Sequence, residues 1–355
     1  MRGKRGAATP LRMSEAIRAA FVRQAGWCRT FGAPFTGAVC AAIAARLDPG
    51  TVVGARVLNW PGDPFADALP MRVTGGLNGL VRAGALPGLA AVYPPHAPTD
   101  DAELADCVAT ALADDRLLPW LDSAPQTNEV MRASVLMSGL LTIAAAHPLP
   151  LRLFELGASA GLNLRMAGYA YRLGEVAFGP ADAPVTLAPT WTGPPPPTAG
   201  VRVVSRRGVD LAPIDLGEAA ARARLLAYIW PDQPARVARA EAAIAAFAAD
   251  PVTLDRGDAA AWVAANVEPQ PGTVTVVYHS IAWVYFPPAT QAAITAHLEL
   301  QAADATAVAP LAWLRYEEDV PGAGVPPTLR LRLWPGDDQL LARAHPHGSS
   351  VEWLA

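Results

Sequence analysis

From residue 151 to the end of the chain, short apolar segments alternate with longer alanine-rich segments, and this alternation constrains the fold more than any other feature. Apolar runs of about four to eight residues predict buried strands, and the alanine-rich runs between them are long enough for helices. Strands that alternate with helices are typical of βαβ units, in which parallel strands form one sheet. We therefore predict an α/β domain of the Rossmann-like type in this part of the chain.

The predicted strands lie at 151–156, 201–205, 251–254, 273–278, 309–316, 328–334 and 350–354. The predicted helices between them lie at about 159–166, 216–229, 234–249, 258–266 and 288–303. The first five strands are followed by connections long enough for parallel pairing, whereas the last two are separated by a short stretch, which indicates an antiparallel last strand. The predicted sheet is therefore seven-stranded and mostly parallel. An insertion at about 168–200 contains the proline run 194–197, which cannot lie inside a strand or helix.

The first third of the chain has a different texture, with apolar residues at helical spacing from Ser14 onward. Further helices are predicted at 36–47, 65–84, 101–118 and 126–146, with breaks rich in proline and glycine between them. We expect a helical N-terminal domain over 1–120 and a cofactor-binding Rossmann-like domain over 121–355.

Composition excludes several classes of protein. Hydrophobic residues make up 52% and charged residues 17%, which excludes intrinsic disorder. The net charge is −4, so no basic surface points to nucleic acid as a partner. The three cysteines are widely spaced and lack metal-ligand spacing, so we interpret them as reduced structural thiols. A metal site is not expected.

No apolar run reaches the roughly 18 residues of a membrane-spanning helix. The basic segment 1–5 is not followed by an apolar segment of the kind that a secretory signal needs. We therefore expect a cytoplasmic protein without a membrane partner.

The segment most suited to bind a cofactor is an apolar strand that runs into a loop of small residues. The residues that define it are Glu155, Gly157, Ser159, Gly161 and Asn163. Small residues let the backbone turn sharply and approach a ligand, and the start of a helix offers unpaired N–H groups. The place also fits the rule that ligands of parallel sheets bind at the carboxyl ends of the strands.

The spacing within this loop separates three classes of cofactor site. A P-loop needs a lysine at its end, and Lys4 is the only lysine of the chain. A dinucleotide fingerprint would need glycine at two positions that hold Ser159 and Leu162. Glu155 followed by small residues at alternate positions resembles the first motif of class I S-adenosylmethionine-dependent methyltransferases. An ordinary tight turn between strand and helix is the alternative.

That resemblance implies a loop that wraps the methionine and ribose of the cofactor, and two later acidic residues fall where the family has its next motifs. Asp210, after the second predicted strand, resembles the residue that accepts hydrogen bonds from both ribose hydroxyls, a task that suits the two oxygens of a carboxylate. Asp258, after the third strand, resembles the residue that meets the adenine amino group. Asp258 could also cap the following helix, and these two roles are compatible.

The fourth predicted strand ends in a segment rich in histidine and aromatic residues. In the methyltransferases this position faces the transferred methyl group, so the resemblance implies catalytic roles for His279 and Tyr285. His279 could act as a general base because an ordinary histidine titrates near neutral pH. The alternatives are a histidine that is hydrogen-bonded at a strand end and aromatic side chains that only pack.

The segment before the first strand is unusually polar for the start of a helix. In methyltransferases this region closes over the cofactor, so Gln126, Asn128 and Arg132 are candidate cofactor-binding residues. Helix capping together with a surface salt bridge is the alternative. The histidines at 345 and 347 and the segment Trp60-Pro-Gly-Asp63 are distinctive, but no mechanism follows from them.

Taken whole, the chain resembles a bacterial family known as a domain of unknown function. The matching elements are Gly32-Ala-Pro-Phe35, Trp60-Pro-Gly-Asp63-Pro, Pro125-Gln-Thr-Asn-Glu129, the segment 155–163, Trp230-Pro-Asp-Gln233, Tyr278-His-Ser280 and Pro346-His-Gly348. Ala212 stands where members of that family tend to carry asparagine. We expect a methyltransferase that uses S-adenosylmethionine and acts on an unidentified small molecule. The alternatives are a non-catalytic protein that binds a nucleotide-type cofactor and an NAD- or FAD-dependent oxidoreductase.

Overall fold

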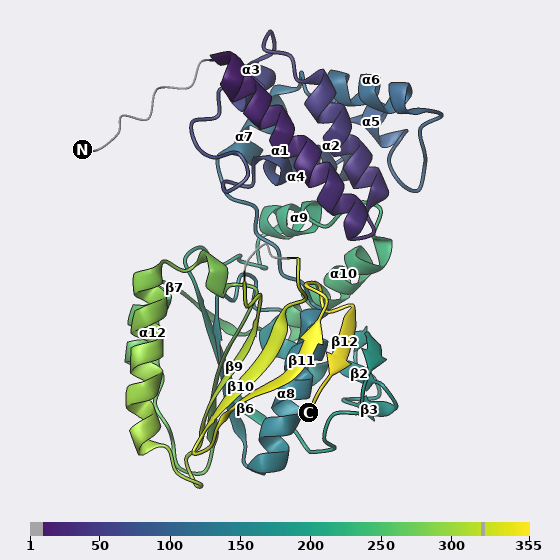
Figure 1. Ribbon diagram of the computed structural model, residues 1–355. Helices are drawn as coiled ribbons and strands as arrows, with labels where there is room; N and C mark the ends of the chain where they lie inside the picture. The colour runs from purple at the N-terminus through teal and green to yellow at the C-terminus, as the bar shows by residue number, and fades with distance from the viewer. Residues whose placement is uncertain (1–9, 321–323) are drawn as a thin grey trace, which may run out of the picture. The chain divides into compact units, whose positions relative to one another are not determined.

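The computed structural model describes residues 10–320 and 324–355 (Figure 1). The basic segment 1–5 lies outside the described residues. Contacts between Cα atoms divide the chain into two units. One is helical and comprises the chain up to Thr127 together with Ala219–Ala238, and the other comprises Asn128–Glu218 and Arg239–Ala355. The sequence analysis assigned residues 121–355 to the Rossmann-like domain, whereas in the structure the segment 219–238 belongs to the helical unit.

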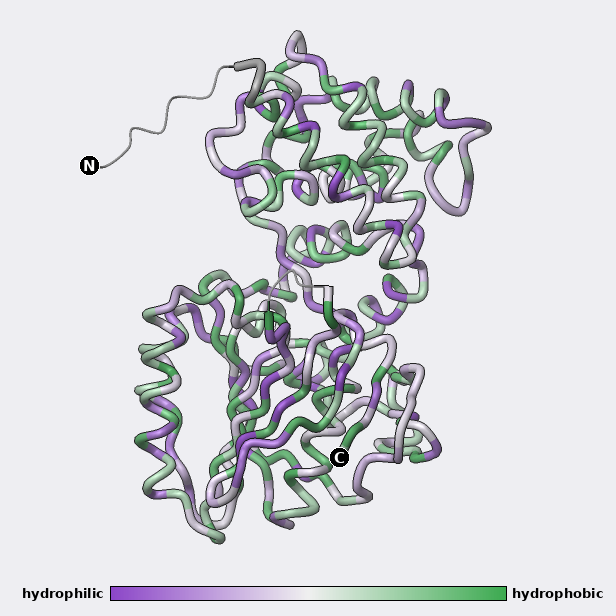
Figure 2. The backbone as a smooth tube through the Cα atoms, viewed as in Figure 1, coloured by the Kyte–Doolittle hydropathy of each residue, from purple (hydrophilic) through white to green (hydrophobic). Residues whose placement is uncertain are grey.

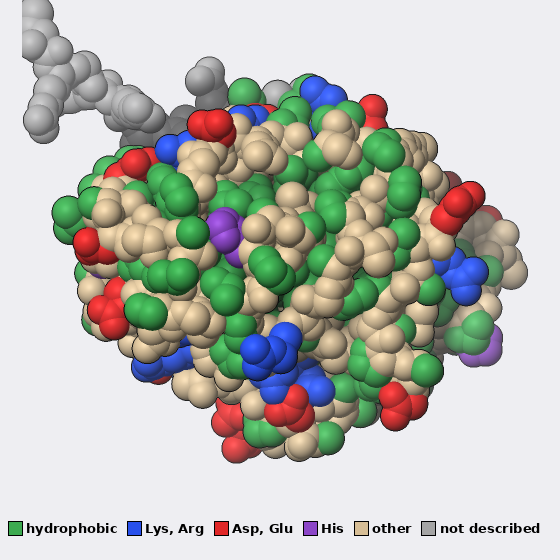
Figure 3. All heavy atoms as spheres, turned by 90° about the horizontal axis from the view of Figure 1, so that it is seen from below, with side chains coloured by type: hydrophobic (Ala, Val, Ile, Leu, Met, Phe, Trp, Pro, Cys, Tyr) green, Lys and Arg blue, Asp and Glu red, His purple; other side chains and the backbone are tan. Residues whose placement is uncertain are grey.

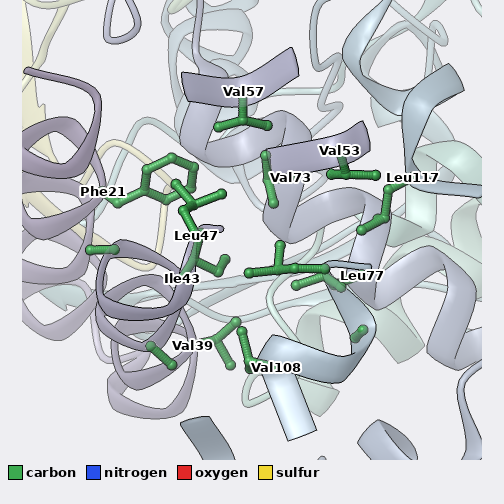
Figure 4. Close-up of a cluster of buried hydrophobic side chains, with 14 of the residues drawn as sticks. Phe21, Val39, Ile43, Leu47, Val53, Val57, Val73, Leu77, Val108 and Leu117 are labelled. Carbon is green, nitrogen blue, oxygen red and sulfur yellow. The ribbon is translucent and has the colours of Figure 1, made fainter. Parts of the chain in front are cut away.

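The helical unit is built on a core of aliphatic and aromatic side chains. Its helices are α1 (Pro10–Thr30), α2 (Pro34–Arg46), α3 (Val52–Leu58), α4 (Leu69–Arg82), α5 (Pro87–Ala90), α6 (Asp101–Ala111), α7 (Leu118–Leu121) and α9 (Ala219–Ala227), with the short 3₁₀ helix η1 (Asp115–Leu117). Phe21, Ile43 and Leu77 are fully buried in the core that Figure 4 shows. Burial of apolar surface of this kind is the main force that holds small helices together.

Helix α4 contains three glycines, which are normally unfavourable inside a helix. A Cβ atom at Gly75 would lie 2.4 Å from the ring of Tyr228, and a Cβ atom at Gly79 would lie 2.4 Å from the ring of Trp120. The glycines therefore leave room for two aromatic rings against the helix, and the loss of helix propensity is offset by their packing.

Two of the distinctive motifs meet inside this unit. Asp232 accepts hydrogen bonds from the Phe35 amide (2.9 Å) and the Thr36 hydroxyl (2.7 Å), at the start of α2. Gln233 donates to the Phe31 carbonyl at 3.0 Å. Asp232 thus caps α2 from a distant part of the sequence, while Pro34 occupies the first turn, where no N–H bond is lost.

The motif at Trp60 is also satisfied within the helical unit. The Trp60 indole donates to Asp67 at 2.8 Å, and Asp63 accepts from the amides of Phe65 and Ala66. These bonds close a tight turn before α4, so the motif has a structural role in this fold.

The second unit is an α/β fold. Its strands are β1 (Leu151–Leu156), β2 (Ala170–Leu173), β3 (Val176–Phe178), β4 (Thr186–Leu187), β5 (Thr190–Thr192), β6 (Val203–Asp210), β7 (Thr253–Arg256), β8 (Val274–Ser280), β9 (Leu311–Glu317), β10 (Thr328–Trp334), β11 (Asp338–Ala344) and β12 (Ser350–Trp353). Its helices are α8 (Arg132–Ala146), α11 (Ala259–Asn266) and α12 (Pro288–Gln301), with the 3₁₀ helices η2 (Asn163–Gly168), η3 (Trp283–Tyr285) and η4 (Ala302–Asp304). Helix α10 (Pro234–Ala249) spans the division between the units.

The prediction of a large, mostly parallel sheet with an antiparallel edge is confirmed, but the number of strands is wrong. Among the described residues the main sheet has nine strands in the order β5-β12-β11-β10-β9-β8-β1-β6-β7. The five strands from β7 to β9 are parallel, and β10, β11 and β12 follow as an antiparallel meander. The two strands that the prediction missed are β11 and β5, and β5 comes from the insertion and pairs with β12.

The insertion also forms a small sheet of β3, β2 and β4. The predicted helix at 159–166 is wrong, because only the 3₁₀ helix η2 follows the loop, and left-handed residues at 157, 159 and 161 interrupt any α-helix there. The helix predicted at 126–146 begins only at Arg132. The second strand was predicted at 201–205 but runs to Asp210.

Helices cover both faces of the parallel strands (Figure 1). Trp313 of β9 packs in a buried cluster with residues of α11 and α12. Its neighbour Leu314 lies on the other face, where a Cβ atom at Gly139 of α8 would be only 2.5 Å away. Figure 2 shows hydrophobic and hydrophilic residues in turn along α12, as expected for a helix with one buried side.

The described helices include none that is long and apolar enough to span a membrane. The cysteines at 28, 40 and 107 are free thiols. On the face drawn in Figure 3, acidic and basic side chains are interspersed among hydrophobic ones.

Candidate functional site

The loop after β1 lies where a parallel sheet of this order binds ligands. β1 pairs with β6 on one side and with β8 on the other, so the direction of the chain through the sheet reverses next to β1. A topological switch point of this kind leaves a crevice at the carboxyl ends of the strands. The segment predicted to bind the cofactor therefore occupies the expected position.

The loop backbone has an unusual conformation. Gly157, Ser159 and Gly161 have φ angles of +68°, +53° and +72°. The glycines adopt this region without a steric penalty, whereas a serine with positive φ is strained by about 1–2 kcal/mol. The amides of Gly157 and Ala158 both donate to the Val209 carbonyl, at 2.9 and 3.0 Å, and this contact holds the loop against β6.

Asp210 is the last residue of β6, next to the loop. One of its oxygens accepts from the Ser159 amide at 2.9 Å and the other from the Ala212 amide at 2.8 Å. The structure thus places Asp210 beside the loop, and the backbone of Ala212 makes a contact that needs no polar side chain. A carboxylate oxygen can accept more than one hydrogen bond, so a side chain of this type can hold several donors at once.

Glu155 lies on the strand itself and is only 2% exposed. Burial raises the pKa of Glu155 to about 8, the hydrogen bond from Tyr278 lowers it, and the charge of Asp210 raises it. The Tyr278 hydroxyl donates to Glu155 at 3.3 Å. Since the pKa lies near 8, Glu155 is mainly protonated at neutral pH, and a positive charge placed beside it would favour its ionisation.

Two side chains of the loop have buried oxygens without a hydrogen-bond partner among the described residues. They are the Ser159 Oγ and the Asn163 Oδ1, and the two residues are 8% and 2% exposed. An unpaired buried polar group costs about 1–3 kcal/mol. Two such oxygens in one loop indicate that a hydrogen-bonding ligand would complete the loop.

The polar segment before α8 reaches the same loop. Asn128 accepts from the Leu162 amide at 2.9 Å. Arg132 donates to the carbonyls of Pro346 and Ser280, at 2.9 and 3.0 Å, and so ties the end of β8 to the turn before β12. Gln126 is half-buried and belongs to the helical unit. The contacts of Asn128 and Arg132 are thus made to backbone groups.

Asp258 caps α11. Its Oδ1 accepts from the amides of Ala260 and Ala261, both at 3.0 Å, and its Oδ2 accepts from Thr290 at 3.3 Å. The side chain is exposed. The capping role that the sequence allowed is confirmed, and its possible contact with adenine stays a prediction.

His279 is buried at the end of β8 with both ring nitrogens engaged. Its Nδ1 lies 2.6 Å from Glu317, and its Nε2 accepts from the Trp313 indole at 3.2 Å. The ring also stacks on Trp283, with 4.8 Å between centroids. This geometry favours the interpretation of a histidine hydrogen-bonded at a strand end. Tyr285 is 79% exposed, so its side chain lies mainly in solvent.

Sequence reasoning missed Glu317 and Tyr278. Tyr278 pairs with Glu155 in the register of β1 and β8, which the sequence does not specify. Glu317 follows the strand predicted at 309–316 by one residue, so the rule on carboxyl ends of strands could have found it.

The histidines at 345 and 347 lie in the turn before β12. The His347 amide donates to His345 Nδ1 at 3.1 Å, and the Tyr316 hydroxyl donates to the His345 carbonyl. Within residues 10–320 and 324–355, no group of three or more metal-ligating side chains gathers.

A comparison with known protein families identifies the family to which the chain belongs. Residues 18–353 match the family described as "Uncharacterized protein conserved in bacteria (DUF2332)". The chain belongs to this family. Searches of curated proteins and of solved structures found no match. The family assignment agrees with the resemblance in the sequence motifs and carries no activity with it.

Proposed function

We propose that this protein binds S-adenosylmethionine at the loop after β1 and transfers its methyl group to a small molecule. The observation that carries the proposal is the pair of unpartnered buried oxygens, on Ser159 and Asn163, in a left-handed loop at the switch point of the sheet. Support also comes from Asp210 at the end of the neighbouring strand, beside the loop.

The residues present fit such a cofactor. The Ser159 hydroxyl and the Asn163 carbonyl oxygen would receive polar partners, and Asp210 beside the loop is a carboxylate, a group that accepts from hydroxyl groups. Glu155 would meet positive charge, since a buried carboxyl group gains most from a cation nearby. When bound, the cofactor supplies an activated methyl group on a positively charged sulfur. The protein would bind the cofactor, orient it toward the substrate and exclude water from the site.

Calorimetry of the full chain with S-adenosylmethionine and S-adenosylhomocysteine tests the proposal. We expect micromolar affinity, reduced several-fold in Ser159→Ala, because that variant removes one hydrogen-bonding group of the loop. Ser138→Ala is the matched control, since Ser138 is a buried serine whose hydroxyl already donates to Val135, on α8. If a well-folded protein gives no heat of binding with either compound, the proposal is wrong.

A second candidate is a protein that binds the cofactor without turnover. It is favoured by the engagement of both His279 nitrogens and the exposure of Tyr285, which leave neither side chain placed as a base. Release of S-adenosylhomocysteine from S-adenosylmethionine, measured with and without a small-molecule fraction of bacterial cells, separates the two. Binding without release would favour the second candidate.

A further inference from the structure

The carboxylate of Glu317 lies at the end of β9 and is 13% exposed. A single oxygen, Oε1, contacts three groups: His279 Nδ1 at 2.6 Å, the Ala282 amide at 3.0 Å and the Trp283 amide at 3.2 Å. Hydrogen bonds to an ionised acceptor are about twice as strong as neutral ones. Glu317 therefore holds the backbone that follows β8 through two amide hydrogen bonds.

The contacts also determine where His279 carries its proton. An indole N–H can only donate, so the bond from Trp313 requires a lone pair on His279 Nε2. The ring proton is then on Nδ1, where it points to Glu317. His279 is held as a neutral ring between a donor and an acceptor, and its stacking on Trp283 fixes its plane.

The backbone held by Glu317 is strained and faces the cofactor loop. Ile281 has a φ angle of +49°, which is rare for a β-branched residue and costs about 1–3 kcal/mol. The next residue, Ala282, packs on Gly157: a Cβ atom at Gly157 would lie 2.7 Å from that of Ala282. The position of Ala282 thus sets the space beside the first glycine of the loop.

We propose that Glu317 is a positioning residue: through His279 and the amides of Ala282 and Trp283, it fixes the wall beside Gly157 and so shapes the cofactor site. The proposal rests on the proposed function for the identity of the ligand. It assigns Glu317 no contact with reacting atoms. It also gives His279 a role that needs no proton transfer.

The test compares Glu317→Ala with Glu317→Gln in the full chain. Alanine leaves three donors without an acceptor, so hydrogen exchange at the Ala282 and Trp283 amides should accelerate at least tenfold. Affinity for S-adenosylhomocysteine should fall about tenfold. Glutamine keeps an acceptor oxygen at the same distance along the side chain, so Glu317→Gln should retain most of the exchange protection and most of the affinity. Asp319→Ala is the control, since Asp319 accepts from Thr328 in the same loop region but touches neither amide.

Nitrogen NMR of the His279 ring tests the proton position that the contacts with Glu317 and Trp313 require. We expect a protonated Nδ1 and an unprotonated Nε2 in the wild type, and an upfield shift of the Nδ1 proton in Glu317→Gln. A protonated Nε2, or unchanged amide exchange in Glu317→Ala, would overturn the proposal. So would faster exchange with unchanged affinity.

A wild type that does not bind S-adenosylhomocysteine refutes the proposed function, and the exchange and NMR measurements still decide the role of Glu317. Faster exchange in Glu317→Ala together with the expected ring signature then supports a positioning role at the loop. Unchanged exchange overturns it. Thermal unfolding of each variant confirms that the compared proteins are folded.

Discussion

Each unit contains a junction where two distant motifs meet around an aspartate. In the helical unit, Asp232 accepts from the start of α2, and in the α/β unit Asp210 accepts from the loop after β1. The first junction leads into a capped helix, and none of its buried side-chain polar atoms among the described residues lacks a partner. The second leads into a strained loop with two unpartnered oxygens on Ser159 and Asn163.

The difference shows which motifs indicate function. An aspartate that binds backbone amides is common to both junctions, so that arrangement alone indicates only structure. Unsatisfied side-chain oxygens, a non-glycine residue of positive φ and a buried acid occur at the α/β junction, whereas the residue of positive φ at the helical junction is a glycine, Gly32. Such costs persist where the surrounding fold sustains them, and they cluster at functional sites.

The largest expected effect concerns the buried acid at the α/β junction. The folded-state pKa of Glu155 is about 8, above its ordinary value of 4.5, so the folded state binds this proton more tightly than the unfolded state does. The stability due to this proton is present at low pH and is lost as pH rises towards 8. Glu155→Gln should therefore gain stability relative to wild type by about 1.4 kcal/mol per pH unit in this window.

Urea unfolding of both proteins between pH 5 and pH 9 measures this difference, and titrating groups that do not interact with Glu155 cancel in the comparison. A difference that stays flat across the window would show that the Glu155 carboxyl group is not buried as described. A buried acid would then no longer distinguish the α/β junction from the helical junction.

The next effect concerns the helical junction. Asp232→Ala removes the acceptor for the Phe35 amide and the Thr36 hydroxyl, so we expect a loss of about 1–2 kcal/mol in stability. Asp232→Asn keeps one acceptor oxygen and should lose less. Urea unfolding checks the order, and affinity for S-adenosylhomocysteine should not change in either variant. A change in affinity without a change in stability would show that the helical junction contributes to ligand binding rather than to the stability of the fold.

The central parallel strands β1, β8 and β9 could be predicted from the sequence, because they are buried on both faces and read as nearly continuous apolar runs. Strand β6 was predicted too short because Arg206 and Arg207 resemble surface residues. In the structure they pair with Asp250 and Asp255, which a single strand cannot show. The place of segment 219–238 depends on the fit of the Tyr228 ring against α4, a long-range contact without a local pattern.

The candidate site was predicted in part for the same reasons. Gly157 and Asp210 follow from strand order and local spacing. The burial of Glu155 by Tyr278 depends on strand register, and the state of His279 depends on two partners from β9. The sequence identifies where a ligand-binding loop lies, whereas the protonation states within it require the three-dimensional neighbours.

The smallest expected effect is the most direct test of the comparison, because it asks whether an unpartnered hydroxyl behaves differently from a partnered one. Ser159→Ala removes a buried oxygen without a partner among the described residues, so its desolvation cost disappears and stability should not fall below that of wild type. Ser138→Ala removes a satisfied hydrogen bond and should cost about 1 kcal/mol. Thermal and urea unfolding measure both, without any ligand. If Ser159→Ala costs as much as Ser138→Ala, the hydroxyl has a structural partner, and its role in ligand binding loses its main support.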